Sequence, residues 1–195
     1  MHGLINRSIQ CFLRDTYGEN IWREIALGAD LGFDSFEALL RYDVAQTEAV
    51  LRAASRTLSK SRDVVLEDVG TYLVSNPNVQ ALRRLLRFGG ESFVDFLHSL
   101  DQLHERAKLA VPDLRLPVLQ LRDHSLTNFT ITVDHKDPGF GFVLVGVLRA
   151  MADDYGALAL IEYQGRKDRY ETIGIELLET RFSEGRDFAL SARSG

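Results

Sequence analysis

The sequence predicts an α+β fold in which a helical N-terminal half packs on a small C-terminal α/β unit that contains an antiparallel sheet. Apolar residues recur every three or four positions from Ile5 to Lys108, which is the period of helices with one buried face. After Pro112 and Pro117 they alternate with polar residues, as in strands with one buried face. No linker rich in Pro, Gly or Ser separates the halves, so we expect one compact unit.

The helical part, residues 1–111, is expected to contain five or six helices. Turn-forming residues mark the breaks between them, at 17–20, 28–34, 59–63, 75–78 and 89–90. The last helix of this part is predicted to cover residues 92–108. Spacings of four, three and four place four of its side chains on one apolar face, namely Phe93, Leu97, Leu100 and His104.

The C-terminal part, residues 112–182, is expected to hold two strands, a helix and a hairpin. The alternating apolar residues are Leu119, Leu121 and Leu126 in the first strand, and Phe129, Ile131 and Val133 in the second. Residues 140–155 are predicted to form a helix, and 157–163 and 172–178 a hairpin around 164–168. Both parts together make a single domain over residues 1–182. The weakly patterned residues 183–195 form a C-terminal tail.

The composition excludes several classes of protein. The 195 residues carry a formal net charge of −5, whereas binding to nucleic acid or to a membrane surface usually depends on a basic face. The longest apolar stretch, residues 140–148, is far shorter than the ~20 residues of a membrane span. The single cysteine, Cys11, permits no internal disulfide, and the N-terminus lacks the apolar run of a secretory signal. We therefore expect a cytoplasmic protein that binds neither nucleic acid nor membranes.

His104 is the most informative candidate for a functional residue. Periodicity alone favours a core histidine that is satisfied by a hydrogen bond, because histidines are commonly part buried. The functional alternative is a single axial ligand to a flat metal cofactor, since an imidazole on a helix facing an apolar pocket is a common haem arrangement. The remaining histidines lack the spacing of a zinc site, and the chain has no hydrolase, kinase or dehydrogenase motif.

Two segments of the chain resemble the haem nitric oxide/oxygen binding family, abbreviated H-NOX or HNOB, which also forms the sensor part of soluble guanylate cyclase. Residues 1–6, Met-His-Gly-Leu-Ile-Asn, and 13–18, Leu-Arg-Asp-Thr-Tyr-Gly, are similar to its first helix. Residues 89–104 are similar to its proximal helix, because they end in Leu-Asp-Gln-Leu-His. The resemblance covers nearly the whole chain. It implies a ligand cavity between the two parts, and His104 as the ligand to the iron of haem b (iron protoporphyrin IX).

The same resemblance assigns three further residues to the haem site. Pro117, thirteen residues after His104, is similar to a proline that presses on the porphyrin and distorts it. Phe142 stands where oxygen-binding members have a distal tyrosine, and Ile5 lines the same distal side. Since a phenylalanine has no hydroxyl to stabilise bound O2, the resemblance implies a pocket that favours NO over O2.

The chain departs from the family at the motif Tyr-x-Ser-x-Arg, which anchors the haem propionates. The matching residues 133–137 are Val-Asp-His-Lys-Asp, so a valine replaces the tyrosine and Asp137 replaces the arginine. A charge-assisted bond of ~1.5–3 kcal/mol becomes a repulsion there, which weakens haem binding. Four residues are candidates to replace the anchor, the nearer His135 and Lys136 and the more distant Arg122 and Arg149.

The leading hypothesis is a bacterial stand-alone haem sensor without catalytic activity of its own. It binds NO, and CO as a second ligand, at ferrous iron opposite His104. By the resemblance, NO weakens or breaks the iron–histidine bond and frees the helix over residues 92–108. The signal then passes to a separate protein such as a histidine kinase or a cyclic-di-nucleotide enzyme.

Two other hypotheses belong to different classes. The runner-up is an H-NOX-like protein with weak or no haem binding, which serves as a binding module for another apolar ligand or for a signalling protein. The replacement of the anchor at Val133 and Asp137 favours it. An enzyme such as a peroxidase is disfavoured, because no distal histidine–arginine pair can be placed in the pocket.

Overall fold

The computed structural model describes residues 1–76, 86 and 90–179. The expected tail at 183–195 and parts of the expected breaks at 75–78 and 89–90 lie outside these residues. The described elements, in chain order, are α1 (Gly3–Tyr17), α2 (Glu19–Gly28), α3 (Val44–Leu58), α4 (Arg62–Ser75), α6 (Phe93–Ser99), the 3-10 turn η2 (Leu100–Gln102), α7 (Leu103–Ala110), β1 (Val118–Asp123), β2 (Asn128–Asp134), α8 (Phe140–Tyr155), β3 (Leu158–Lys167) and β4 (Tyr170–Glu179). Within this part of the chain, no helix has the length and apolar character needed to cross a membrane.

Helices α1 to α4 form a helical lobe, which we define as residues 1–76, with an apolar core of its own. Three side chains begin helices by accepting a backbone N–H, namely His2 for α1, Asp43 for α3 and Ser61 for α4. Gly18 joins α1 to α2 at a φ of 93°, a conformation that favours glycine. Trp22 of α2 is fully buried among the residues of this core.

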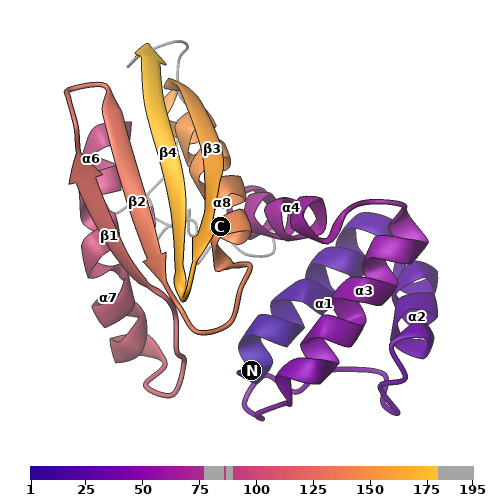
Figure 1. Cartoon of the computed structure of the whole chain (residues 1–195). Helices are drawn as coiled ribbons and strands as arrows, with labels where there is room; N and C mark the ends of the chain where they lie inside the picture. The colour runs from indigo at the N-terminus through magenta and orange to yellow at the C-terminus, as the bar shows by residue number, and fades with distance from the viewer. Residues whose placement is uncertain (77–85, 87–89, 180–195) are drawn as a thin grey trace, which may run out of the picture.

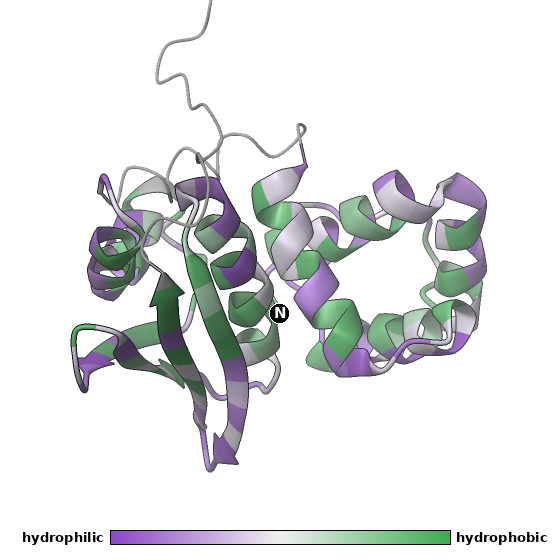
Figure 2. Ribbon diagram, turned by 90° about the horizontal axis from the view of Figure 1, so that it is seen from above, coloured by the Kyte–Doolittle hydropathy of each residue, from purple (hydrophilic) through white to green (hydrophobic). Residues whose placement is uncertain are grey.

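The second lobe, the sheet lobe, comprises residues 90–179 and is built on a four-stranded antiparallel sheet in the order β1-β2-β4-β3. In β2, Phe129, Ile131 and Val133 are buried while their neighbours are more exposed, which confirms the alternation predicted from the sequence. Helices α6 and α8 cover one face of the sheet (Figure 1). Seen from above, the two lobes lie side by side and the N-terminus lies at their boundary (Figure 2).

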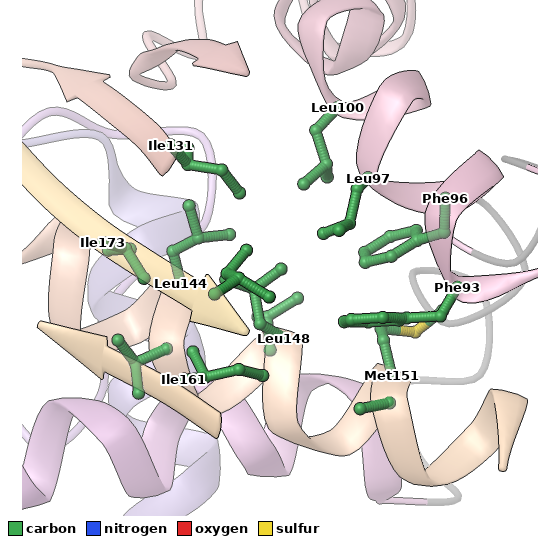
Figure 3. Packing of buried hydrophobic residues seen from close by; sticks show 14 of the residues in the cluster. Phe93, Phe96, Leu97, Leu100, Ile131, Leu144, Leu148, Met151, Ile161 and Ile173 are labelled. Carbon is green, nitrogen blue, oxygen red and sulfur yellow. The ribbon is translucent and has the colours of Figure 1, made fainter. Parts of the chain in front are cut away.

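Helix α8 lies in the middle of the sheet lobe's core. Figure 3 shows Phe93 and Phe96 of α6 directed toward Leu148 and Met151 of α8, with Ile161 and Ile173 of the sheet on the other side. All of these side chains are almost fully buried. Because α8 is packed from both sides, its orientation is fixed by the core of the lobe.

The two lobes are joined where α4 crosses α8. Two glycines permit this approach, because a Cβ atom at Gly70 would lie 1.9 Å from the carbonyl oxygen of Val143, and one at Gly146 would lie 2.0 Å from that of Glu67. Arg149 pairs with Glu67 across the same crossing at 2.5 Å. The helices therefore pack backbone against backbone at this point.

The expectation of one continuous helix over residues 92–108 is wrong, because the chain forms α6, η2 and α7 instead. The Ser99 hydroxyl donates to the Phe96 carbonyl oxygen at 2.7 Å, and Arg106 donates to the Ser99 carbonyl oxygen at 3.1 Å. Such bonds from side chains compete with the backbone ladder of a helix and favour a local break.

The hairpin of β3 and β4 also differs from the expectation. The strands continue to Lys167 and resume at Tyr170, so the turn lies at residues 168–169 rather than at 164–168. Gly165, at a φ of 127°, lies at a register shift within β3, as in a bulge. Leu126 was expected in the first strand, but it lies beyond the end of β1 and is exposed.

Candidate functional site

An apolar cavity of about 270 Å³ lies between the helical lobe and the sheet lobe. Helices α1, α4 and α8 contribute apolar side chains at spacings of three and four residues, which place them on one face of each helix. These side chains are Ile5 and Ile9 of α1, Leu66, Val69 and Leu73 of α4, and Phe140, Val143, Leu144 and Val147 of α8. The cavity that the resemblance implied between the two parts is therefore present.

Two hydroxyl groups are among the polar groups of the cavity wall. Ser8 donates to the Leu4 carbonyl oxygen at 2.9 Å, and Thr47 donates to Oδ1 of Asn6 at 2.7 Å. A hydroxyl has a single proton to donate, and each of these protons is used by an acceptor within the protein. Among the described residues, the wall therefore offers a bound molecule no free O–H donor.

One ion pair lies in the cavity wall. Arg62 of α4 pairs with Glu48 of α3 through Nε at 3.1 Å and Nη2 at 2.7 Å. The same Nη2 donates to the Pro138 carbonyl oxygen at 3.2 Å, across the boundary between the lobes. The Glu48 carboxylate pairs with the Arg62 guanidinium in bidentate geometry. The net positive charge that Arg62 contributes to the cavity is therefore small.

His104 is half-buried on α7, beside the cavity. Its Nδ1 atom lies 3.0 Å from the Leu116 carbonyl oxygen. A carbonyl oxygen can only accept, so Nδ1 carries the proton of the neutral ring and Nε2 keeps its lone pair for a metal. His104 is not among the residues that line the cavity, but its neighbours Leu103, Leu116 and Pro117 are.

Asp101, three residues before His104, attaches the same turn to the sheet. Its Oδ1 accepts the backbone N–H of Leu121 in β1 at 2.9 Å. Since β1 is an edge strand, this bond satisfies a donor on the side where no further strand lies within the described sheet. Together with the contact between His104 and Leu116, it ties η2 and α7 to the continuous segment 116–121.

The remaining residues expected in the haem site are placed differently from one another. Ile5 and Pro117 line the cavity. Phe142 does not, because its ring stacks on Tyr163 with the ring centroids 4.0 Å apart, while Phe140 lines the cavity instead. Two residues turn a helix by about 200°, so positions 140 and 142 face opposite sides of α8.

The residues at the positions of the family's anchor differ in their burial and in their contacts. Val133 is fully buried in β2. Nδ1 of His135 accepts the backbone N–H of Asp137 at 3.1 Å, and the ring packs against Phe140. Lys136 is exposed, whereas Asp137 lines the cavity.

A second pocket of about 80 Å³ adjoins the cavity, and we call it the polar pocket. Met1, Ile5 and Asp137 line both spaces. The other lining residues of the polar pocket are His2, Arg41, Asp113, Arg115, His135 and Lys136. The cavity therefore has a charged end at the N-terminus of the chain.

Of the four candidates for the replaced anchor, His135 and Lys136 lie at the polar pocket. Arg122 and Arg149 line neither space, and Arg149 is paired with Glu67. Arg41 and Arg115 were missed by the sequence analysis. They come together only in the fold, where Arg41 reaches the Asp113 carbonyl oxygen at 3.2 Å, and no local motif marks them.

Glu171 is a third residue that the sequence analysis missed. It is buried in β4, where its carboxylate accepts the backbone N–H groups of Gly139 at 3.0 Å and Gly141 at 3.1 Å. It thus satisfies backbone donors at the start of α8, where the cavity wall begins. The alternation of Ile173, Ile175 and Leu177 places residue 171 on the buried face, which was the available signal.

Tyr163 completes the group around Glu171. Its hydroxyl donates to Oε1 of Glu171 at 3.1 Å. Burial of the phenol and the negative charge of Glu171 raise the pKa of Tyr163 to about 12. The protonated phenol is therefore held against the carboxylate that caps α8.

These features define a two-lobed α+β protein with an apolar ligand cavity and an adjacent histidine whose Nε2 lone pair is available. The Haem-NO-binding family model matches residues 2–162, and the chain belongs to this family. It is thus a member of a haem-binding gas-sensor domain family related to soluble guanylate cyclase.

Sequence similarity to an animal guanylate cyclase agrees with membership in this family. The chain is 25% identical over 154 residues to soluble guanylate cyclase gcy-31 of Caenorhabditis elegans, a match that covers 79% of this chain and 22% of the relative. The chain thus spans about a fifth of the length of this animal protein. The bacterial origin expected above stays a prediction.

Two solved structures show the same fold. An H-NOX mutant with the unnatural amino acid 4-cyano-L-phenylalanine has a TM-score of 0.75 at 17% identity, over 94% of this chain and 100% of that one. An oxygen-binding H-NOX domain related to soluble guanylate cyclases has a TM-score of 0.70 at 18% identity, over 96% and 100%. The α+β class predicted from the sequence is confirmed.

Proposed function

We propose that this protein is a sensor of nitric oxide that holds haem b in the cavity through His104. The observation that carries the proposal is the contact of Nδ1 of His104 with the Leu116 carbonyl oxygen at 3.0 Å, beside an apolar cavity between two lobes. This contact fixes the tautomer in which Nε2 is the metal-binding nitrogen.

The residues present fit haem at three points. The cavity wall is apolar on both lobes, as the faces of a porphyrin require. His104 supplies a nitrogen ligand, and Pro117 lies in the wall within the same segment as Leu116. The polar pocket places cationic side chains at one end, where the carboxylates of haem would need them.

When bound, haem would supply an iron atom at which a gas molecule can bind, and His104 would hold that iron through Nε2. The part played by this chain would be to couple the position of His104 to its lobes. His104 is tied to Leu116, and Asp101 is tied to Leu121, so movement of α7 is transmitted to β1. The helical lobe is held to α8 by the close crossing at Gly70 and Gly146, and α8 packs on the same sheet.

The proposal includes selectivity for NO over O2. Bound O2 carries partial negative charge and is stabilised by a hydrogen-bond donor in the pocket. The hydroxyls of Ser8 and Thr47 donate to Leu4 and Asn6 and leave no free proton for such a bond. CO needs no such donor, so we propose it as a second ligand.

We further propose that the signal passes to a separate protein such as a histidine kinase or a cyclic-di-nucleotide enzyme, and that the chain has no catalytic activity of its own. Asp101 and the exposed face of α7 move with His104, so they are the part of the surface where a partner would detect the change.

Titration of the purified protein with haem tests the proposal. We expect uptake of one haem per chain and a Soret band that shifts when NO is added to the reduced protein. The variant His104→Ala is expected to keep its fold but to lose the spectrum of histidine-ligated iron. An unchanged spectrum in that variant, or a folded wild-type protein that takes up no haem, would refute the proposal.

The second candidate function is that of a binding module with weak or no haem binding. Its ligand would be another apolar molecule or a signalling protein. The buried Val133 and the Asp137 carboxylate at the cavity favour it, because neither can replace the family's anchor. A folded protein that refuses haem in the titration would support this candidate.

A further inference from the structure

The charged end of the cavity is formed by four chain segments that are distant in sequence, around residues 1–5, 41, 113–115 and 135–137. Residues 1–3 pair with residues 40–42, through the N–H of Gly3 to the Leu40 carbonyl oxygen at 2.8 Å and the N–H of Tyr42 to that of Met1 at 2.9 Å. Arg41 lies within this pairing as the partner of His2. Two further segments, residues 113–115 and residues 135–137 directly after β2, line the same polar pocket.

Arg41 is held in position at this end. Its backbone pairs with His2, and its Nη2 donates to the Asp113 carbonyl oxygen at 3.2 Å. That carbonyl belongs to the segment that contains Arg115 and leads to Pro117 in the cavity wall. These contacts therefore bring Arg41 and the segment of Arg115 together at the polar pocket.

The balance of charge at this end favours an anion. Arg41, Arg115 and Lys136 line the polar pocket against the two carboxylates of Asp113 and Asp137. Among the described residues, none of these three cations takes part in an ion pair. By contrast, the two other arginines near the cavity and the lobe junction, Arg62 and Arg149, are neutralised by Glu48 and Glu67.

Two histidines lie at the same place, and His2 adds an N–H donor. Nδ1 of His2 accepts the N–H of Leu4 at 3.2 Å, and Nδ1 of His135 accepts that of Asp137 at 3.1 Å. Because a backbone N–H can only donate, the contact with Leu4 places the proton of the neutral His2 ring on Nε2. Nδ1 of His135 also lies 3.2 Å from the Asp137 carbonyl oxygen, so the two contacts of His135 fix neither tautomer. Both rings line the polar pocket.

We infer that Arg41 and Arg115, assisted by Lys136, replace the missing Tyr-x-Ser-x-Arg anchor and bind the carboxylates of the cavity ligand. The ligand class that matches an apolar cavity with a cationic end is a flat apolar molecule with anionic groups on one edge. This inference rests on the proposed function, in which the ligand is haem and the anionic groups are its two propionates. The main part of the anchor is thus moved from positions 133 and 137 to the segments around residues 41 and 115, while Lys136 remains from the original segment.

A comparison of two porphyrins tests the inference. Haem carries two propionates, whereas its dimethyl ester has the same ring and iron without the two charges. The haem-free protein is titrated with each, and binding is followed by quenching of Trp22, the single tryptophan. The variants are Arg41→Ala/Arg115→Ala, the charge-conserving Arg41→Lys/Arg115→Lys, and the control Arg23→Ala/Arg52→Ala, which removes two arginines that line neither pocket.

We expect the double alanine variant to bind haem about tenfold more weakly, since two rim ion pairs are lost, and to bind the ester within about twofold of wild type. The lysine variant recovers part of the haem affinity, and the control variant matches wild type. Equal weakening for haem and ester, or no weakening for haem, would overturn the inference while leaving the proposed function intact. A wild-type protein that binds neither porphyrin would overturn both.

Discussion

Nδ1 of His104 lies 3.0 Å from the carbonyl oxygen of Leu116, the residue directly before Pro117. This one contact joins α7 to the cavity wall and fixes which nitrogen of the ring is available to a metal. It also explains why the two residues expected from the resemblance, His104 and Pro117, belong to one structural unit. A shift of α7 acts on the wall segment directly, without an intermediate element.

The glycine crossing of α4 and α8 predicts a strong effect of small substitutions on stability. Gly70→Ala and Gly146→Ala each place a Cβ atom about 2 Å from a carbonyl oxygen of the other helix, so the helices must separate. We expect a loss of about 2–3 kcal/mol of unfolding free energy for each variant. Urea denaturation measures it.

Gly28→Ala is the matched control for these substitutions. Its added Cβ meets only the Cβ of Ala53, at the ordinary distance of 3.6 Å. We expect unchanged or slightly increased stability, because alanine favours helix over glycine by up to about 1 kcal/mol. Equal stability of the Gly70 and Gly28 variants would contradict the close crossing.

Glu171 is predicted to stabilise the start of α8. In Glu171→Gln an amide NH2 group must face one of the two backbone N–H donors, those of Gly139 and Gly141, and one donor is left unsatisfied. We expect a loss of about 1–3 kcal/mol in unfolding free energy. The exposed Glu176 on the same strand is the control, and Glu176→Gln is expected to stay within about 0.5 kcal/mol of wild type. Equal effects of the two substitutions would show that Glu171 does not cap the helix.

Stability is predicted to fall at high pH through Tyr163. Burial and the charge of Glu171 raise its pKa from 10.0 to about 12 in the folded protein. Between these values the unfolded chain loses the phenol proton while the folded chain keeps it, so the folded state loses stability as pH rises. Unfolding free energies measured from pH 9 to 12 are expected to decline less steeply in Tyr163→Phe. Burial and Asp15 also raise the pKa of Tyr72, so part of the decline persists. An identical slope in wild type and Tyr163→Phe would contradict this role.

The orientation of α8 predicts the outcome of a substitution at position 142. Phe142 stacks on Tyr163 and lies on the side of α8 away from the cavity. We therefore expect Phe142→Tyr to leave O2 binding by the haem-loaded protein unchanged, although the resemblance places a distal tyrosine at this position. Oxygen titration of the reduced protein measures it. A stable O2 complex in the variant would show that residue 142 faces the haem.

Periodicity and turn residues were sufficient to predict most of the fold. The breaks at residues 17–20 and 59–63, the alternation in β2 and the helix over 140–155 depend on local patterns, which the structure contains. The break at η2 coincides with bonds from the Ser99 hydroxyl and from Arg106 to backbone carbonyl oxygens, which the apolar periodicity does not reveal. The hairpin turn was displaced because the bulge at Gly165 lets β3 continue past a residue that usually ends a strand.

The sequence assigned candidate site residues where a motif lies within one segment. His104 and Pro117, thirteen residues apart, were assigned by resemblance, and the structure places Pro117 in the cavity wall and His104 beside it. Arg41 and Arg115 were not, because their proximity depends on the pairing of residues 1–3 with 40–42 and on the fold of both lobes. The sequence also did not predict which side of α8 faces the cavity, because the packing of Phe142 on Tyr163 decides it.

The resonance Raman spectrum of the reduced, haem-loaded protein tests the central claim most directly, because it reports the bond between iron and histidine itself. We predict an iron–histidine stretching band in the wild-type protein that disappears when NO is added. The band should be absent in His104→Gly, with imidazole in the buffer restoring it as a free ligand. Persistence of the wild-type band in His104→Gly without imidazole would contradict the account, because another residue would then hold the haem.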